Sequence, residues 1–155
     1  MANVRIVLHK DEIMADIKAI AHVTGRRLLT PDNMDKASDI QTPEEGPDLD
    51  IVARALSSAF DNIKHVCSRY LNVGRLEDFN SLEDISGDYM INLNMPLRWN
   101  YSATSRIKSL MHEHIVCYGL YSIFEKTNPE DATIYLEKAS KPSFISISRI
   151  SYNSK

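Results

Sequence analysis

The residues best suited to catalysis or metal binding lie in one stretch, residues 112–117, which read His-Glu-His-Ile-Val-Cys. A zinc peptidase of the His-Glu-x-x-His type needs its second histidine four positions after the first, so that both imidazoles share one helical face. Position 116 is Val, so that motif is absent. His114 and Cys117 are one helical turn apart, and His65 and Cys67 are further possible ligands, which leaves a Cys/His metal site open as an alternative. Buried thiols and a core histidine explain the same residues more simply, and we predict no bound metal.

Other catalytic signatures are missing from the sequence. Cys67 and Cys117 fall on apolar helical faces, where a thiol is inert, and no Gly-x-Ser-x-Gly elbow is present. The five glycines are scattered, so no glycine-rich loop can hold a phosphate. The sequence therefore predicts a protein that is not an enzyme and holds no cofactor.

The composition is that of an ordinary globular protein. The chain has 155 residues, of which 43% are hydrophobic and 25% charged, and its net charge is −3. This length and balance predict one domain over residues 1–155. No apolar run is long enough to cross a bilayer, and the N-terminus lacks the layout of a signal peptide, so we expect synthesis in the cytoplasm and no membrane contact. The net charge also argues against sequence-specific binding of nucleic acid.

Four helices are expected to position these residues. Asp11 can cap a first helix, along which apolar residues recur at helical spacing and which Gly25 is placed to end. Apolar residues recur in the same way from Asp48 to about Tyr70. Asn100 or Ser102 can cap a third helix, whose apolar seam consists of Ala103, Ile107, Leu110, His114, Cys117, Tyr121 and Phe124, with a second row at Met111, Ile115 and Tyr118. The series Asn-Pro-Glu-Asp at 128–131 begins the fourth helix. Pro142 interrupts it, and residues 143–151 fit either a strand or a kinked helix, of which we prefer the helix.

Two short segments have the pattern of strands. The run from Val4 to Leu8 predicts a strand or an extended arm over residues 1–9, and strict alternation of apolar and polar residues predicts a second strand at 89–95. The second strand can pair with the first in the same chain or with its copy in a neighbouring subunit. The expected fold is mainly α, a four-helix bundle-like connector with a small β element.

Charge is unevenly distributed along the chain. Residues 29–47 predict a long acidic loop, and residues 141–155 form a basic C-terminal tail. In a ring, the loop of one copy could meet the tail of the next, although the asymmetry could equally be coincidental. Two isolated stretches, Arg26-Arg27 and Arg98-Trp99-Asn100-Tyr101, could instead touch phosphate and stack on bases, but a packed or solvated face is the simpler interpretation. The interface residues that we predict are Val4, Ile6 and Leu8 for strand addition, Asp32, Asp35, Asp39, Glu44 and Glu45 in the loop, and Lys141, Arg149 and Lys155 in the tail.

Three stretches of the C-terminal half form a recognisable series. They are residues 90–100, Met-Ile-Asn-Leu-Asn-Met-Pro-Leu-Arg-Trp-Asn, the helix containing residues 112–116, and Lys-Thr-Asn-Pro-Glu-Asp-Ala-Thr-Ile-Tyr at 126–135. This series resembles a group of small virion proteins from tailed, crAss-like bacteriophages and prophages of gut Bacteroides-type hosts. The resemblance covers roughly residues 48–140. The last helix is expected to run on in such proteins, and Pro142 departs from that pattern.

The resemblance implies a structural subunit of the phage neck or tail. Such subunits form a homo-oligomeric ring, of about twelve copies, around the DNA passage below the portal. The implied partners are further copies, the portal and other neck or tail proteins, and the implied location is the virion after synthesis in the bacterial host cytoplasm. The alternative from a different class is a monomeric or dimeric helical module that binds or regulates other proteins without catalysis.

Overall fold

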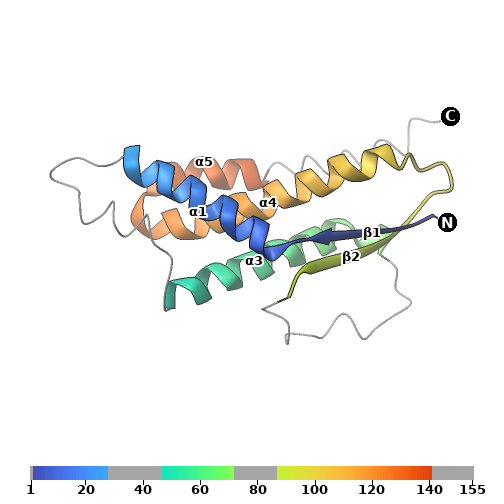
Figure 1. Ribbon diagram of the computed structural model, residues 1–155, viewed down its shortest axis with the longest axis horizontal. Helices are drawn as coiled ribbons and strands as arrows, with labels where there is room; N and C mark the ends of the chain where they lie inside the picture. Colours follow the sequence, from blue (N-terminus) through green and yellow to red (C-terminus); the bar gives the residue numbers. More distant parts are fainter. Residues whose placement is uncertain (1, 28–46, 72–86, 141–155) are drawn as a thin grey trace.

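The computed structural model describes residues 2–27, 47–71 and 87–140 (Figure 1). The described part is mainly helical, with one small sheet, as the sequence predicted. Its elements in chain order are β1 (Ala2–Leu8), α1 (Lys10–Arg27), α3 (Pro47–Val66), the short 3-10 helix η1 (Ser68–Tyr70), β2 (Tyr89–Met95), α4 (Ser102–Thr127) and α5 (Pro129–Ser140).

Helix α4 is the central element of the fold. It packs against α1, α3, α5 and β1, so its side chains meet neighbours on several sides (Figure 1). Met111, Ile115, Leu120 and Phe124 on this helix have no exposed surface. Met111 and Ile115 belong to the predicted second row and are fully buried. Leu110, His114 and Tyr121 of the predicted seam are partly exposed. The seam is broader than predicted because the helix has partners on more than one face.

The two strands pair with each other within the chain. β1 and β2 are antiparallel, in a register that runs from Ala2 opposite Met95 to Leu8 opposite Tyr89. Alternate side chains of both strands are buried, which confirms the period-two pattern of residues 89–95. An isolated bridge joins Leu71 to Leu93. Of the two partners considered for the second strand, the structure therefore shows the first strand of the same chain.

Several element ends differ from the predicted ones. α3 ends at Val66, and the chain tightens into η1 instead of continuing as an α-helix to Tyr70. Gly25 does not end α1, which continues to Arg27. Neither Asn100 nor Ser102 is the N-cap of α4, because the helix begins at Ser102 and Tyr101 takes the N-cap position without a side-chain hydrogen bond. Asn100 still accepts a hydrogen bond on Oδ1 from the backbone N–H of Ser102 at 3.0 Å. α5 begins at Pro129, as predicted.

Gly119 lies on the side of α4 that packs against α1 and α3. A Cβ atom at this position would be 2.7 Å from Cδ1 of Ile17 and 3.0 Å from Cδ2 of Leu56. Neither Ile17 nor Leu56 has any exposed surface. The absence of a side chain at Gly119 therefore lets these three helices share one tightly packed core.

Most of the predicted acidic loop and all of the basic tail lie outside the described residues. The same holds for the choice between helix and strand at 143–151.

Candidate functional site

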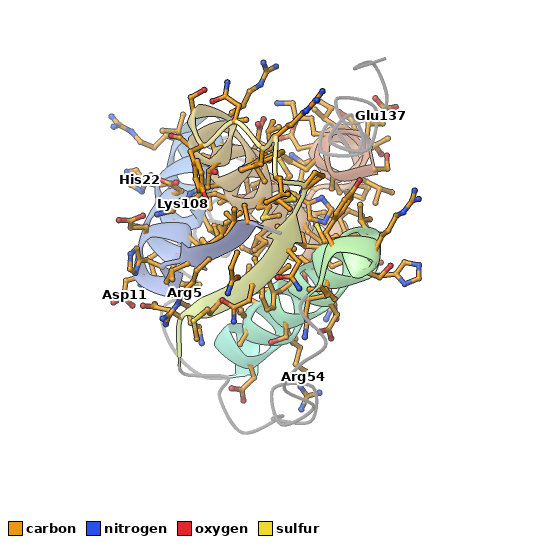
Figure 2. The ribbon with its side chains drawn as sticks, turned by 90° about the vertical axis from the view of Figure 1, so that its right-hand side faces the viewer. Arg5, Asp11, His22, Arg54, Lys108 and Glu137 are labelled. Atoms are coloured by element: carbon orange, nitrogen blue, oxygen red, sulfur yellow. The ribbon has the colours of Figure 1, made fainter. Side chains whose placement is uncertain are left out.

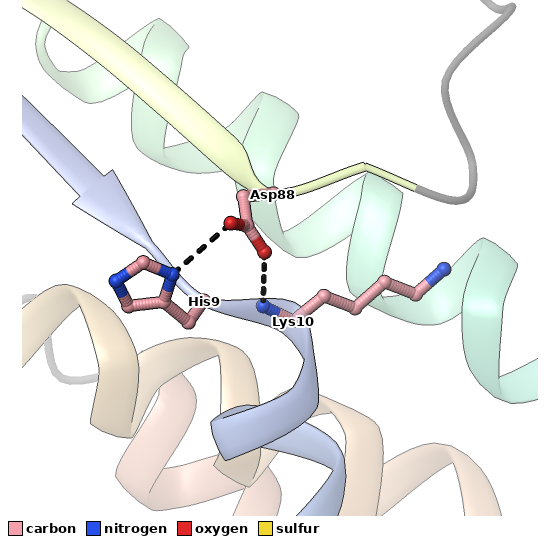
Figure 3. A network of polar contacts seen from close by, with 3 residues as sticks. All are labelled: His9, Lys10 and Asp88. Carbon is pink, nitrogen blue, oxygen red and sulfur yellow. Dashed lines mark hydrogen bonds and ion pairs between the residues drawn. The ribbon is translucent and has the colours of Figure 1, made fainter.

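The junction between β1 and α1 is held by Asp88, which directly precedes β2 (Figure 3). Its Oδ2 lies 3.0 Å from Nδ1 of His9, and its Oδ1 accepts a hydrogen bond from the backbone N–H of Lys10 at 3.1 Å. The Lys10 N–H and then the His9 ring hold the pKa of Asp88 below its usual value. Asp88 thus caps α1, the role that the sequence suggested for Asp11.

A carboxylate that orients the Nδ1 side of a histidine is also a component of catalytic triads. Such a pair needs a nucleophile within reach and a site that excludes water. Here both side chains are 48% exposed. The contacts of Asp88 join β1, α1 and β2 at the surface, so we assign this cluster a structural role.

A second histidine–aspartate pair connects α4 to α1. Nε2 of His112 lies 2.6 Å from Oδ2 of Asp16, and the two side chains are 25% and 56% exposed. The pair bridges residues 96 positions apart in the sequence. The pair links α4 to α1 at the surface of the molecule. Exposed ion pairs of this kind contribute little to stability.

Of the four residues considered for a metal site, the two cysteines are buried, His114 is partly buried and His65 is exposed. Cys67 and Cys117 are each 6% exposed, and burial raises the pKa of Cys67 to about 11. Burial, followed by the charge of Glu113, also raises the pKa of Cys117. A thiol must lose its proton to bind a metal, and both environments oppose that step. Within residues 2–27, 47–71 and 87–140, no group of three or more His, Cys, Asp or Glu side chains could hold a metal ion.

The turn between β2 and α4, residues 96–101, exposes large apolar side chains. Leu97 is 85% exposed and Tyr101 is 66% exposed, while Trp99 packs partly against the core. The turn is held by hydrogen bonds from the backbone N–H of Trp99 to the carbonyl of Pro96 (2.9 Å) and from Nε1 of Trp99 to Oγ1 of Thr104 (3.2 Å). It is thus an ordered turn that presents apolar groups to solvent, a feature of protein interaction sites.

The predicted interface residues divide into two groups. Val4, Ile6 and Leu8 lie in the core of their own chain, at 5%, 2% and 1% exposure. These side chains could contact a neighbour only if β1 left its own sheet, because they point into the packed interior. The other predicted positions, Asp32, Asp35, Asp39, Glu44, Glu45, Lys141, Arg149 and Lys155, lie outside the described residues.

Local sequence patterns do not identify Leu97, Tyr101 or Asp88 as surface residues of interest. Leu and Tyr are usually buried, so only their place in a turn after Pro96 could have suggested exposure. The contact of Asp88 with His9 depends on strand pairing across 79 positions, which no local pattern indicates.

Comparison of the whole chain with known protein families, curated proteins and solved structures finds no match. None of the helices in the described part of the chain has the length and apolar character needed to cross a membrane.

Proposed function

We propose that this protein is a structural virion subunit that assembles with further copies into a ring in the neck or tail of a tailed bacteriophage. The observation that carries the proposal is the ordered, exposed turn at residues 96–101. Leu97 and Tyr101 contribute little to the core of the single chain, because most of their surface faces solvent. Burying that surface in a contact between copies would stabilise an assembly.

Two further features support a structural role. The turn belongs to the stretch that resembles phage connector proteins, so the exposed residues and the resemblance coincide. The net charge of −3 also suits a ring around DNA, because a mildly acidic lumen repels phosphate and lets the duplex slide. The portal and adjacent neck or tail proteins are the proposed partners.

The oligomeric state of the purified chain tests the proposal. Light scattering coupled to size exclusion, across a range of concentrations, should detect association, and negative-stain electron microscopy should reveal rings. The double variant Leu97→Ser/Tyr101→Ser should weaken association at least about tenfold, since apolar contact area is lost. Val23→Ser is the matched control, because Val23 is 67% exposed on α1, away from the turn.

A chain that stays monomeric at every concentration, and that does not bind portal or tail proteins, would contradict the proposal. That result would favour the alternative, a monomeric helical module that binds other proteins.

A further inference from the structure

The outer face of α5 carries an exposed apolar side chain between two acids. Glu130, Ile134 and Glu137 are spaced so that they share one face of the helix. Ile134 is 50% exposed, and both glutamates are exposed. Figure 2 shows Glu137 on the outer side of α5, at the edge of the molecule away from α1. We call these three residues the acidic face.

Other charged groups of α5 near Ile134 have contacts of their own. Nζ of Lys138 lies over the ring of Tyr135, 5.4 Å from its centroid, and Asp131 accepts a hydrogen bond from Nδ2 of Asn128 at 2.8 Å. Among the large apolar side chains that are exposed in residues 2–27, 47–71 and 87–140, only Ile134 has two exposed acids on its own helical face. The acidic face is therefore distinct from the other exposed apolar positions of the described structure.

The exposed turn at residues 96–101 has the opposite charge beside its apolar side chains. Leu97 and Tyr101 are 85% and 66% exposed, and the exposed Arg98 lies between them in the chain. Arg106 follows on α4 and is also exposed, and residues 89–112 contain no Asp or Glu. The turn would thus complement a surface that has acids around an apolar side chain, which is the composition of the acidic face.

The acidic face and the exposed turn of one copy are too far apart to meet. α5 packs against the second half of α4, where the ring of Tyr135 lies 5.5 Å from that of Phe124 (Figure 1). Phe124 follows Ser102, the first residue of α4, by about 22 residues, which corresponds to about 33 Å at roughly 1.5 Å per residue. The turn precedes Ser102, so a contact between the two surfaces requires two molecules.

We infer that the acidic face of one copy binds the exposed turn of the next copy, head to tail. This inference rests on the proposed function and identifies the surface that receives the turn. Ile134 would pack against Leu97 and Tyr101. The two glutamates would pair with Arg98 and Arg106. Because the contact joins two different patches, it closes into a ring when the rotation between copies allows.

The end of α1 offers a second surface that is both basic and apolar. Val23 is 67% exposed, and the exposed Arg26 lies about one helical turn further along. This surface has one small apolar side chain, whereas the turn has two larger ones, so the turn can bury more apolar area around Ile134. We therefore expect a charge change at Arg26 to leave the association of copies unchanged.

Charge reversal tests which surfaces meet. The turn variant is Arg98→Glu/Arg106→Glu, and the face variant is Glu130→Lys/Glu137→Lys. Each variant alone should associate at least about tenfold more weakly than the native chain, because like charges then oppose each other. A chain with all four substitutions should associate again, and so should an equimolar mixture of the two variants, since every contact then joins opposite charges. Light scattering coupled to size exclusion measures the association.

Matched variants separate these effects from a general change of charge or of folding. Arg26→Glu/Asp50→Lys alters exposed residues of α1 and α3 in the same way and should associate like the native chain. Circular dichroism shows whether each variant keeps its helical signal. If Glu130→Lys disturbs the first turn of α5, the single pair Glu137→Lys and Arg98→Glu carries the same test.

Ile134 and Leu136 provide a matched pair for the apolar part of the contact. They are 50% and 40% exposed on the same helix, but residues two positions apart do not share a helical face. Ile134→Ser should weaken association about tenfold, whereas Leu136→Ser should leave it unchanged. A bismaleimide should also join a Leu97→Cys chain to an Ile134→Cys chain faster than to a Leu136→Cys chain.

The outcomes separate this inference from the proposed function. If the turn and face variants both associate like the native chain, or if mixing them restores nothing, the inference is wrong while the ring stands. Loss of association in Arg26→Glu/Asp50→Lys, with the face variant unaffected, would also overturn it. A native chain that stays monomeric at every concentration refutes the ring and this contact together.

Discussion

The two sides of α4 are packed by different kinds of side chain. Toward α1 and α3, Gly119 receives the fully buried Ile17 and Leu56 at close range. Toward α5, the contacts are aromatic and polar. The ring of Phe124 lies 5.5 Å from that of Tyr135, His114 lies near the backbone of Ala139, and Cys117 lies near Lys138.

This difference suggests that the two sides have different stabilities. An aliphatic interface packed around a glycine tolerates little change in volume, and it opens only when the whole domain unfolds. Only two small residues of α5, Ala132 and Ala139, are buried, whereas its larger apolar residues Ile134 and Leu136 are exposed. We therefore expect α5 to separate from α4 at a lower free energy than the rest of the fold.

The largest effect should come from a cavity on the aliphatic side. Leu56→Ala removes a fully buried side chain that contacts α4, and we expect a loss of about 3 kcal/mol in the free energy of unfolding. Urea denaturation followed by circular dichroism measures it. Leu136→Ala on α5 is the control, because Leu136 is 40% exposed, and its cost should stay near or below about 0.5 kcal/mol. Equal losses would show that the two sides do not differ.

Adding volume at Gly119 should be the next largest perturbation. Gly119→Leu places a side chain where Ile17 and Leu56 already lie, and overpacking of this kind costs about 1–3 kcal/mol. Gly119→Ala should cost less, because the gain in helix propensity, about 1 kcal/mol, offsets part of the clash with the flexible end of Ile17. Ser105→Leu on the exposed face of α4 controls for the added leucine. A stable Gly119→Leu variant would mean that α1 and α3 can shift away from α4.

On the aromatic side, removing a ring should loosen α5 alone. Tyr135→Ala loses the ring contact with Phe124, which is worth about 0.5–1.5 kcal/mol beyond buried area. The two native cysteines report where the chain opens. Maleimide labelling of Cys117, which lies near Lys138 of α5, should become faster, while labelling of Cys67 after α3 should keep its native rate. An equal acceleration at both thiols would indicate global destabilisation instead.

Local patterns in the sequence were sufficient to predict the elements but not their contacts. The alternation from Tyr89 to Met95 and the Asn-Pro start at 128–129 each depend on neighbouring residues, and both predictions are confirmed. The cap of α1 could not be predicted in this way. Asp11 has the right local position, but Asp88 supplies the hydrogen bond, and it does so only because β1 pairs with β2.

The candidate site was harder to predict for a related reason. Residue type indicates burial for Leu97 and Tyr101, yet the geometry of the turn exposes both. The apolar pattern of Val4, Ile6 and Leu8 predicts an interface for strand addition to a neighbour, whereas the structure shows that the chain buries these side chains itself. A single sequence defines which surfaces are apolar, whereas the packing of distant elements decides which of them remain exposed.

The smallest effect should be a pH dependence confined to the aromatic side. Burial lowers the pKa of His114 from its usual 6.5, and this outweighs the hydrogen bond with the backbone of Ala139, which raises it. The folded state therefore binds a proton less readily than the unfolded state, so stability present above pH 6.5 declines as the pH falls from 6.5 toward the lowered value. Asp88 would affect stability in a separate, more acidic pH range. Because the folded state lowers its pKa from the usual 3.8, ionised Asp88 stabilises the fold above pH 3.8, and this contribution is lost as the pH falls below that value.

Hydrogen exchange at pH 7 and pH 5.5 would show where the His114 effect acts. Protection should fall more in α5 and the facing turns of α4 than in α1 and α3, because the charged imidazole would be forced between α4 and α5. His114→Phe retains a ring beside Tyr118, whose centroid lies 6.5 Å from that of His114, but it cannot take up a proton. This variant should lose the pH dependence in α5 between those two values. A pH response spread evenly over α1, α3, α4 and α5, or one unchanged in His114→Phe, would mean that α5 is not a separately opening unit and that the two sides of α4 form one cooperative core.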